Sequence, residues 1–145
     1  MDYREHAKDL LKRQKSLVSA FSAIKSELDS LENERISVKA AIERAKGSGK
    51  DTTGFEDILI NLLADLDDCR FRMSIVEREL RKIEKGMQML DEYQRDLIIA
   101  FFIEPSQGIA DDLMEKWYKE RSSLYRDRVI ALELFTRSVY GVVQL

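Results

Sequence analysis

The sequence predicts an all-α protein, in which a long antiparallel coiled-coil hairpin is followed by a small C-terminal unit of three helices. The chain has 145 residues and only one proline, which favours long uninterrupted helices. Two long stretches repeat apolar residues at heptad spacing, and a glycine-containing segment separates them. We therefore expect two domains, a helical hairpin over residues 1–90 and a three-helix, helix-turn-helix unit over residues 91–145.

The first heptad stretch predicts a single helix over residues 3–46. Ten of the twelve a and d positions are apolar, far more than a chance helical face would show. Asp2 is placed to cap the start of this helix. The a and d positions are Ala7, Leu10, Gln14, Leu17, Phe21, Ile24, Leu28, Leu31, Arg35, Val38, Ile42 and Ala45.

A loop over residues 47–54 separates this helix from a second heptad stretch that starts at Phe55. Thirteen of its fourteen a and d positions are apolar, and Cys69 on a d position is expected to be buried. Two seams of similar length joined by a short loop predict an antiparallel hairpin. The second seam consists of Phe55, Leu59, Leu62, Leu66, Cys69, Met73, Val76, Leu80, Ile83, Met87, Leu90, Gln94, Leu97 and Phe101. We expect Gly86 to mark a bend where the hairpin ends.

The C-terminal stretch predicts three short helices around a core of their own. The run at residues 97–103 is too apolar for a two-helix seam alone, and the segment around Pro105 ends it. A helix from Ile109 to about Tyr118 and a helix from Ser122 or Ser123 to about Tyr140 should follow, with a tight turn between them. The residues expected to face this core are Leu113, Met114, Trp117, Tyr118, Leu124, Ala131, Leu132, Phe135 and Val139.

Composition argues against several classes of site. With one cysteine and one histidine, the chain has no set of thiolates or imidazoles for a metal, and we predict no metal and no disulfide. Gly47 to Lys50 resembles part of a phosphate loop, but Asp51 stands where Ser or Thr is needed, so we predict no nucleotide cofactor. No nucleophile, base and orienting group form a recognisable set, so we predict no enzymatic activity. The absence of a signal core or a long apolar run predicts a cytoplasmic protein without a membrane partner.

The charges are unevenly distributed. The whole chain carries 24 basic and 27 acidic residues, a formal net charge of −3 that by itself disfavours nucleic acid. Within residues 116–128, however, five basic residues accompany only Glu120 and Asp127, which gives a local charge of +3. This cluster lies on the turn and on the start of the last helix, where a reader of the DNA major groove needs basic and hydroxyl side chains.

The last helix also carries a family resemblance. The run from Arg121 to Leu132, followed by Phe135 and by Tyr140-Gly141, resembles the last helix of sigma-70 region 4-like proteins. It is most similar to phage and prophage regulators of the ArpU type, which read Arg-Ser-Thr-Val-Tyr-Arg, then Ala-Leu and a Phe-x-x-x-Leu-Tyr-Gly tail. The specific match covers roughly residues 91–141, and the hairpin matches only in general character.

This resemblance implies a prophage transcription regulator that binds double-stranded promoter DNA. It also implies contacts to host RNA polymerase. The heptad seams of the hairpin predict a homo-oligomer formed through the coiled coil. By position, Arg121 and Arg128 would hold phosphates, and Ser122, Ser123 and Arg126 would be nearest to base edges. Tyr125 would pack on the DNA backbone or on the domain itself. The implied DNA-binding set is Lys119, Arg121, Ser122, Ser123, Tyr125, Arg126 and Arg128.

Departures from the family pattern keep a second hypothesis open. Met114 or its neighbours stand where the first helix of the motif usually has a small residue. Lys119 stands where an apolar residue usually precedes the turn, and the carboxylate of Asp127 would repel phosphate. These departures, with the acidic total, favour the alternative of a coiled-coil scaffold or adaptor without DNA binding. The ordered match from Arg121 to Gly141 favours the transcription regulator. The sequence also leaves open whether the hairpin closes within one chain or is exchanged between two chains.

Overall fold

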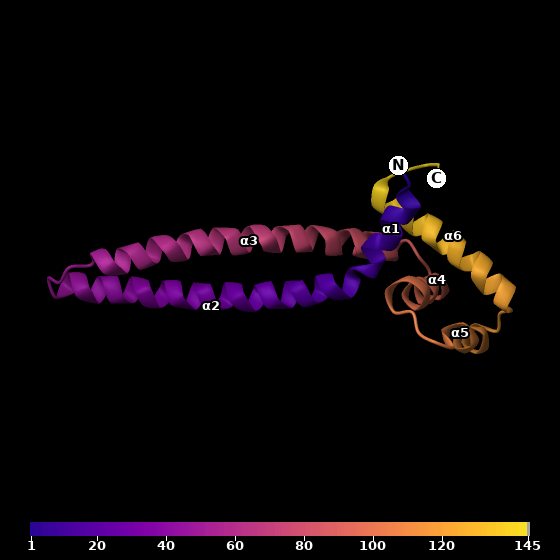
Figure 1. Ribbon diagram of the computed structural model, residues 1–145, viewed down its shortest axis with the longest axis horizontal. Coiled ribbons are helices and arrows are strands. Elements are labelled where there is room, and N and C mark those ends of the chain that lie inside the picture. Colours follow the sequence, from indigo (N-terminus) through magenta and orange to yellow (C-terminus); the bar gives the residue numbers. More distant parts are fainter. Residues whose placement is uncertain (145) are drawn as a thin grey trace. The chain divides into compact units, whose positions relative to one another are not determined.

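The computed structural model describes residues 1–144, and these form an all-α fold (Figure 1). The two longest helices, α2 and α3, pack side by side in opposite directions, which confirms the predicted antiparallel hairpin. Shorter helices follow and pack on α6. The helices are α1 (Tyr3–Lys12), α2 (Gln14–Gly47), α3 (Thr53–Gln88), α4 (Glu92–Ile98), the π-helix η1 (Ile99–Ile103), α5 (Ile109–Trp117) and α6 (Arg121–Tyr140).

The prediction of one helix over residues 3–46 is wrong, because the helix is interrupted at Arg13. Residue Arg13 has φ −84° and ψ −4°, and its N–H donates to the carbonyls of both Asp9 and Leu10. The interruption allows α1 to pack on α6 and η1. Leu11, which lies off the heptad seam, is fully buried there.

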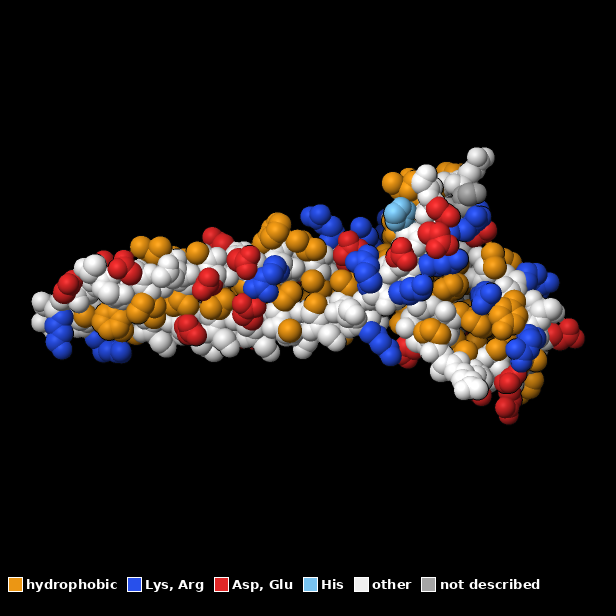
Figure 2. All heavy atoms as spheres, in the orientation of Figure 1, with side chains coloured by type: hydrophobic (Ala, Val, Ile, Leu, Met, Phe, Trp, Pro, Cys, Tyr) orange, Lys and Arg blue, Asp and Glu red, His pale blue; other side chains and the backbone are white. Residues whose placement is uncertain are grey.

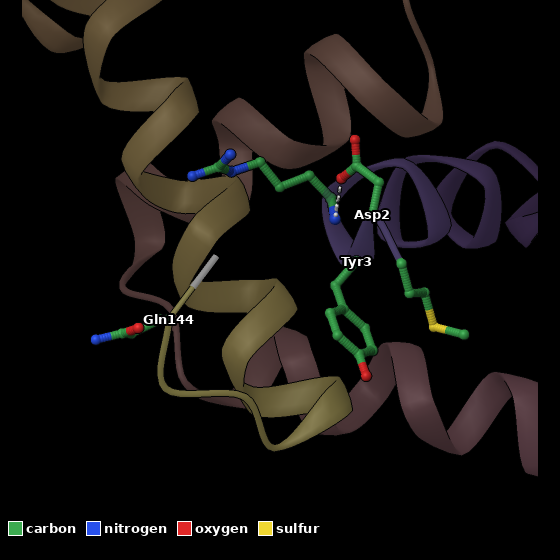
Figure 3. A pocket seen from close by; sticks show the side chains of 5 residues that line it. Asp2, Tyr3 and Gln144 are labelled. Atoms are coloured by element: carbon green, nitrogen blue, oxygen red, sulfur yellow. Dashed lines mark hydrogen bonds between the residues drawn. The ribbon is translucent and has the colours of Figure 1, made fainter.

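Helix α1 is capped as the sequence predicts. The Asp2 carboxylate accepts hydrogen bonds from the backbone N–H groups of Arg4 (3.1 Å) and Glu5 (3.3 Å). Figure 3 shows this cap beside Tyr3, at a shallow hollow that also includes Gln144.

The chain divides by packing into two compact units. One contains residues 19–77, the larger part of the hairpin, and the other contains residues 1–18 together with the chain from Arg78 onward. The expected domain division after residue 90 stays a prediction.

In the hairpin unit, the predicted heptad seam forms the interface between the helices. Ile24, Cys69 and Met73 are buried in its centre, and the Cys69 thiol donates to the carbonyl of Ile24. Ion pairs flank the seam, from Arg70 to Glu32 and from Arg72 to Glu27. Burial raises the pKa of the Cys69 thiol above its ordinary value.

The other unit has two adjoining apolar clusters. Gly86 lies within α3, which continues to Gln88, and a Cβ at this position would collide with Phe135 of α6. The expected bend at Gly86 stays a prediction, and the absence of a side chain there permits close packing of α3 and α6. One cluster contains Ala7, Leu10, Leu11, Ile83, Leu90, Ile98, Ala131, Leu132 and Phe135, and the other contains Leu97, Ala100, Leu113 and Leu124.

The connections to α4 and α5 follow local sequence signals. Asp91 and Gln94 form a capping box that starts α4, because each side chain accepts from the backbone N–H of the other residue. The apolar run then continues as the π-helix η1, whose end is marked by a bond from the N–H of Glu104 to the carbonyl of Ile99 (2.7 Å). The break around Pro105 is where the sequence predicts it.

Candidate nucleic-acid interface

The connection between α5 and α6 is the predicted tight turn, three residues long. Helix α5 ends at Trp117, and α6 begins at Arg121. The N–H of Lys119 donates to the carbonyl of Met114 (3.2 Å), as does the N–H of Tyr118. These bonds close the last turn of α5 and direct the chain into α6.

One face of α6 is buried against the rest of its unit. Leu124, Ala131, Leu132 and Phe135 are all buried, as the sequence predicts. The helix ends at Gly141, whose φ of 66° suits a glycine C-cap. The position of α6 is thus fixed along its whole length.

The opposite face of the first turns of α6 is exposed. Ser122 and Arg126 are both exposed, the Arg126 side chain to 69%. Tyr125 and Val129 lie on the same side of the helix and are partly exposed. This surface presents hydroxyl, guanidinium and aliphatic groups, which match the donors, acceptors and thymine methyl groups of a DNA major groove. Ser123, by contrast, is half-buried.

Several basic side chains of the predicted cluster already have acidic partners. Arg121 pairs with Asp111 (2.6 Å), and Lys116 pairs with Asp96 (2.7 Å), which raises the pKa of the Lys116 ammonium. Because Asp96 and Asp111 lie outside residues 116–128, their inclusion lowers the formal charge of the cluster from +3 to +1. Counting charges only within residues 116–128 therefore overstates the positive charge of this surface.

Two other cations lie over aromatic rings. The Arg128 guanidinium carbon lies 4.5 Å from the centroid of the Tyr125 ring and 5.0 Å from that of Phe101. The Lys119 ammonium lies 5.4 Å from the centroid of the Tyr93 ring. Such cation–π contacts orient the charged groups while leaving them positively charged.

Asp127 has a structural partner that its sequence position does not reveal. The hydroxyl of Tyr93 on α4 donates to its carboxylate over 2.8 Å, and the Asp127 side chain is only 18% exposed. Burial, and then this hydrogen bond, raises the pKa of Tyr93 well above its ordinary value of 10. Arg126 lies 3.4 Å from the other carboxylate oxygen. The charge of Asp127 is thus turned toward α4.

The predicted core position of Tyr118 is wrong. Its side chain is 95% exposed in the turn between α5 and α6. Its neighbour Trp117 is half-buried as expected, and the indole N–H donates to Asp96 (2.9 Å). Two adjacent aromatic residues at a helix end offer no sequence signal for which one is buried.

Comparison of the chain with protein-family models, with curated proteins and with solved structures found no match. Among residues 1–144, no helix is both long and apolar enough to span a membrane.

Proposed function

We propose that this chain is a DNA-binding transcription regulator of the prophage type that acts in the cytoplasm, and that it is not an enzyme. In this proposal the first two turns of α6 enter the major groove of promoter DNA. The observation that carries it is the exposed face of Ser122, Tyr125, Arg126 and Val129, on a helix that follows a three-residue turn and is buried on its other side.

The side chains of this surface divide into two roles. Arg126 and Ser122 are nearest to the base edges, with Val129 available to a thymine methyl group. Arg121, Arg128 and Lys119 contact phosphates and hold the helix in register. The inward orientation of Asp127 supports the proposal, since it reduces the repulsion of phosphate that its sequence position suggests.

Because Arg121 and Lys116 have acidic partners, the affinity of the chain for nonspecific DNA is expected to be low. With a local charge near +1, the attraction to nonspecific DNA should be weak, and most of the binding free energy should depend on the correct sequence. Host RNA polymerase, or a second copy of the chain, would add the remaining contacts on a promoter.

The test is selection of binding sites from a random pool of double-stranded DNA, followed by affinity measurements on the enriched fragment. If Arg126 reads a guanine, Arg126→Ala should weaken binding by about 1–3 kcal/mol at that fragment. Arg44→Ala is the matched control, because Arg44 is an exposed arginine near the end of α2, far along the chain from α6. Failure to enrich any sequence, or equal affinities of the two variants, would contradict the proposal.

A second candidate function is a coiled-coil scaffold or adaptor, and exposed apolar residues of the hairpin favour it. On α3, Ile60 and Phe71 are 63% and 64% exposed, and Leu63 and Ile75 are also exposed. Figure 2 shows hydrophobic side chains at the surface of the hairpin on the face in view. Side chains of this kind are common at surfaces where helices associate.

Light scattering of the intact chain separates the roles of the hairpin. If α3 mediates self-association, the wild type is an oligomer and Phe71→Glu shifts it toward the monomer. Met89→Glu is the control, because Met89 is 67% exposed but lies beyond the end of α3. If the wild type is a monomer, or if both substitutions have equal effects, the hypothesis of self-association through this surface of α3 is refuted.

A further inference from the structure

Tyr118 has a backbone conformation that tyrosine rarely adopts. With φ 54° and ψ 46° it lies in the left-handed region, and it is the only non-glycine residue with positive φ among residues 1–144. Its own N–H and that of Lys119 both donate to the carbonyl of Met114, so the residue ends α5 at a position where glycine is usual. A Cβ makes this conformation unfavourable.

The side chain of Tyr118 makes no packing contact that would offset this unfavourable backbone conformation. At 95% exposure its ring packs on no part of the chain from residue 1 to residue 144, and no contact between its ring and another ring or a cation is found there. Glycine or asparagine would serve the turn better. A residue that is unfavourable for folding and remains exposed points to a role in binding.

We propose that Tyr118 contacts the sugar–phosphate backbone of double-stranded DNA beside the groove that α6 enters, and that its hydroxyl donates to a phosphate oxygen. This inference rests on the proposed function. Tyr118 lies three residues before Arg121, at the end of α6 that presents the candidate base-reading residues. Tyrosine suits this place because its ring covers deoxyribose while its hydroxyl reaches phosphate.

The test compares Tyr118→Phe and Tyr118→Asn with the wild type on a selected DNA fragment. Both variants lose the hydroxyl, whereas Asn tolerates the left-handed conformation better than Tyr. We expect each variant to bind about ten- to hundredfold more weakly, the change that corresponds to one lost hydrogen bond to a charged group. The fluorescence of Trp117, the only tryptophan, reports binding next to the altered residue.

Thermal unfolding separates a contact with DNA from damage to the fold. Tyr118→Asn should melt at the same temperature as the wild type or higher, so that weaker binding cannot result from unfolding. Met89→Asn, at another exposed side chain, should leave the affinity unchanged.

Three outcomes would overturn the inference, and they differ in what else they imply. Wild-type affinity in both Tyr118 variants refutes the contact and leaves the proposed function intact. Wild-type affinity in Tyr118→Phe alone refutes the hydroxyl–phosphate bond. Failure of the wild-type chain to bind any DNA refutes both the contact and the proposed function.

Discussion

Substituting alanine for Gly86 should destabilise the protein, although the same change stabilises most helices. Alanine is favoured over glycine in a helix interior by about 1 kcal/mol. A Cβ at residue 86, however, would lie 2.8 Å from Cγ2 of Val139 and closer than 3.0 Å to two ring carbons of Phe135. Because the Phe135 ring is completely buried, it cannot move out into solvent to relieve these contacts.

The size of the effect follows from these opposing contributions. Overpacking of a dense core costs about 1–3 kcal/mol, and three contacts this close justify the upper part of that range. After subtraction of the helix propensity, the net loss for Gly86→Ala should be about 2 kcal/mol in the free energy of unfolding. Urea denaturation followed by Trp117 fluorescence measures it, since Trp117 belongs to the same packing unit.

Two further variants make this prediction specific. Gly54→Ala changes the second residue of the same helix, where an added Cβ would meet no atom of another segment within 4 Å, so unfolding followed by circular dichroism should show a gain in stability of about 0.4–1 kcal/mol. In a Phe135→Leu background the ring is gone, and Gly86→Ala should then cost much less. If Gly86→Ala stabilises the wild type as Gly54→Ala does, the argument from close packing is refuted.

Three other predictions concern the hydrogen bond between Tyr93 and Asp127 and the buried thiol of Cys69. Asp127→Ala should lower the free energy of unfolding by about 2 kcal/mol, because it removes the charged acceptor of the Tyr93 hydroxyl, and an unchanged urea midpoint would argue against that bond. Since the pKa of Tyr93 is raised in the folded state, its stabilising effect is complete below pH 10 and is lost as the pH rises above that value. Alkaline titration of stability should therefore show a smaller decline in Tyr93→Phe than in the wild type, and parallel declines would count against this assignment. Cys69 is fully buried with a raised pKa, so iodoacetamide at pH 8 should modify it slowly in the native protein and rapidly in urea; fast native labelling would contradict the burial.

Much of the fold was predictable because heptad spacing and helix-ending residues are local signals. The seam of α2 and α3, the break around Pro105 and the end of α6 at Gly141 all follow from patterns within a few residues. The interruption at Arg13 was not predicted from the heptads, since the apolar spacing resumes in the same register at Leu17 and one polar a position, Gln14, is compatible with a continuous helix. Only Leu11, an apolar residue off the seam, indicated that this segment packs on something other than α3.

The candidate site was predictable in outline but not in its electrostatics. The exposed positions of Ser122 and Arg126 follow from the apolar face of α6, which fixes the opposite side of the helix. The pairing of Arg121 with Asp111, and of Asp127 with Tyr93, joins residues 10 and 34 positions apart. Charge counting along the sequence cannot capture such pairs. The exposure of Tyr118 depends on one backbone angle that composition does not reveal.

The salt dependence of DNA binding tests the central claim most directly. If Lys119, Arg121 and Arg128 each neutralise one phosphate, with Arg121 exchanging its Asp111 partner for DNA, a plot of log affinity against log salt concentration should have a slope of about −2.7 per bound chain. The measurement is made on a selected fragment between about 50 and 200 mM salt, the range over which such contacts change most. That slope is the predicted result, and a chain that binds no DNA at the lowest salt would contradict the account.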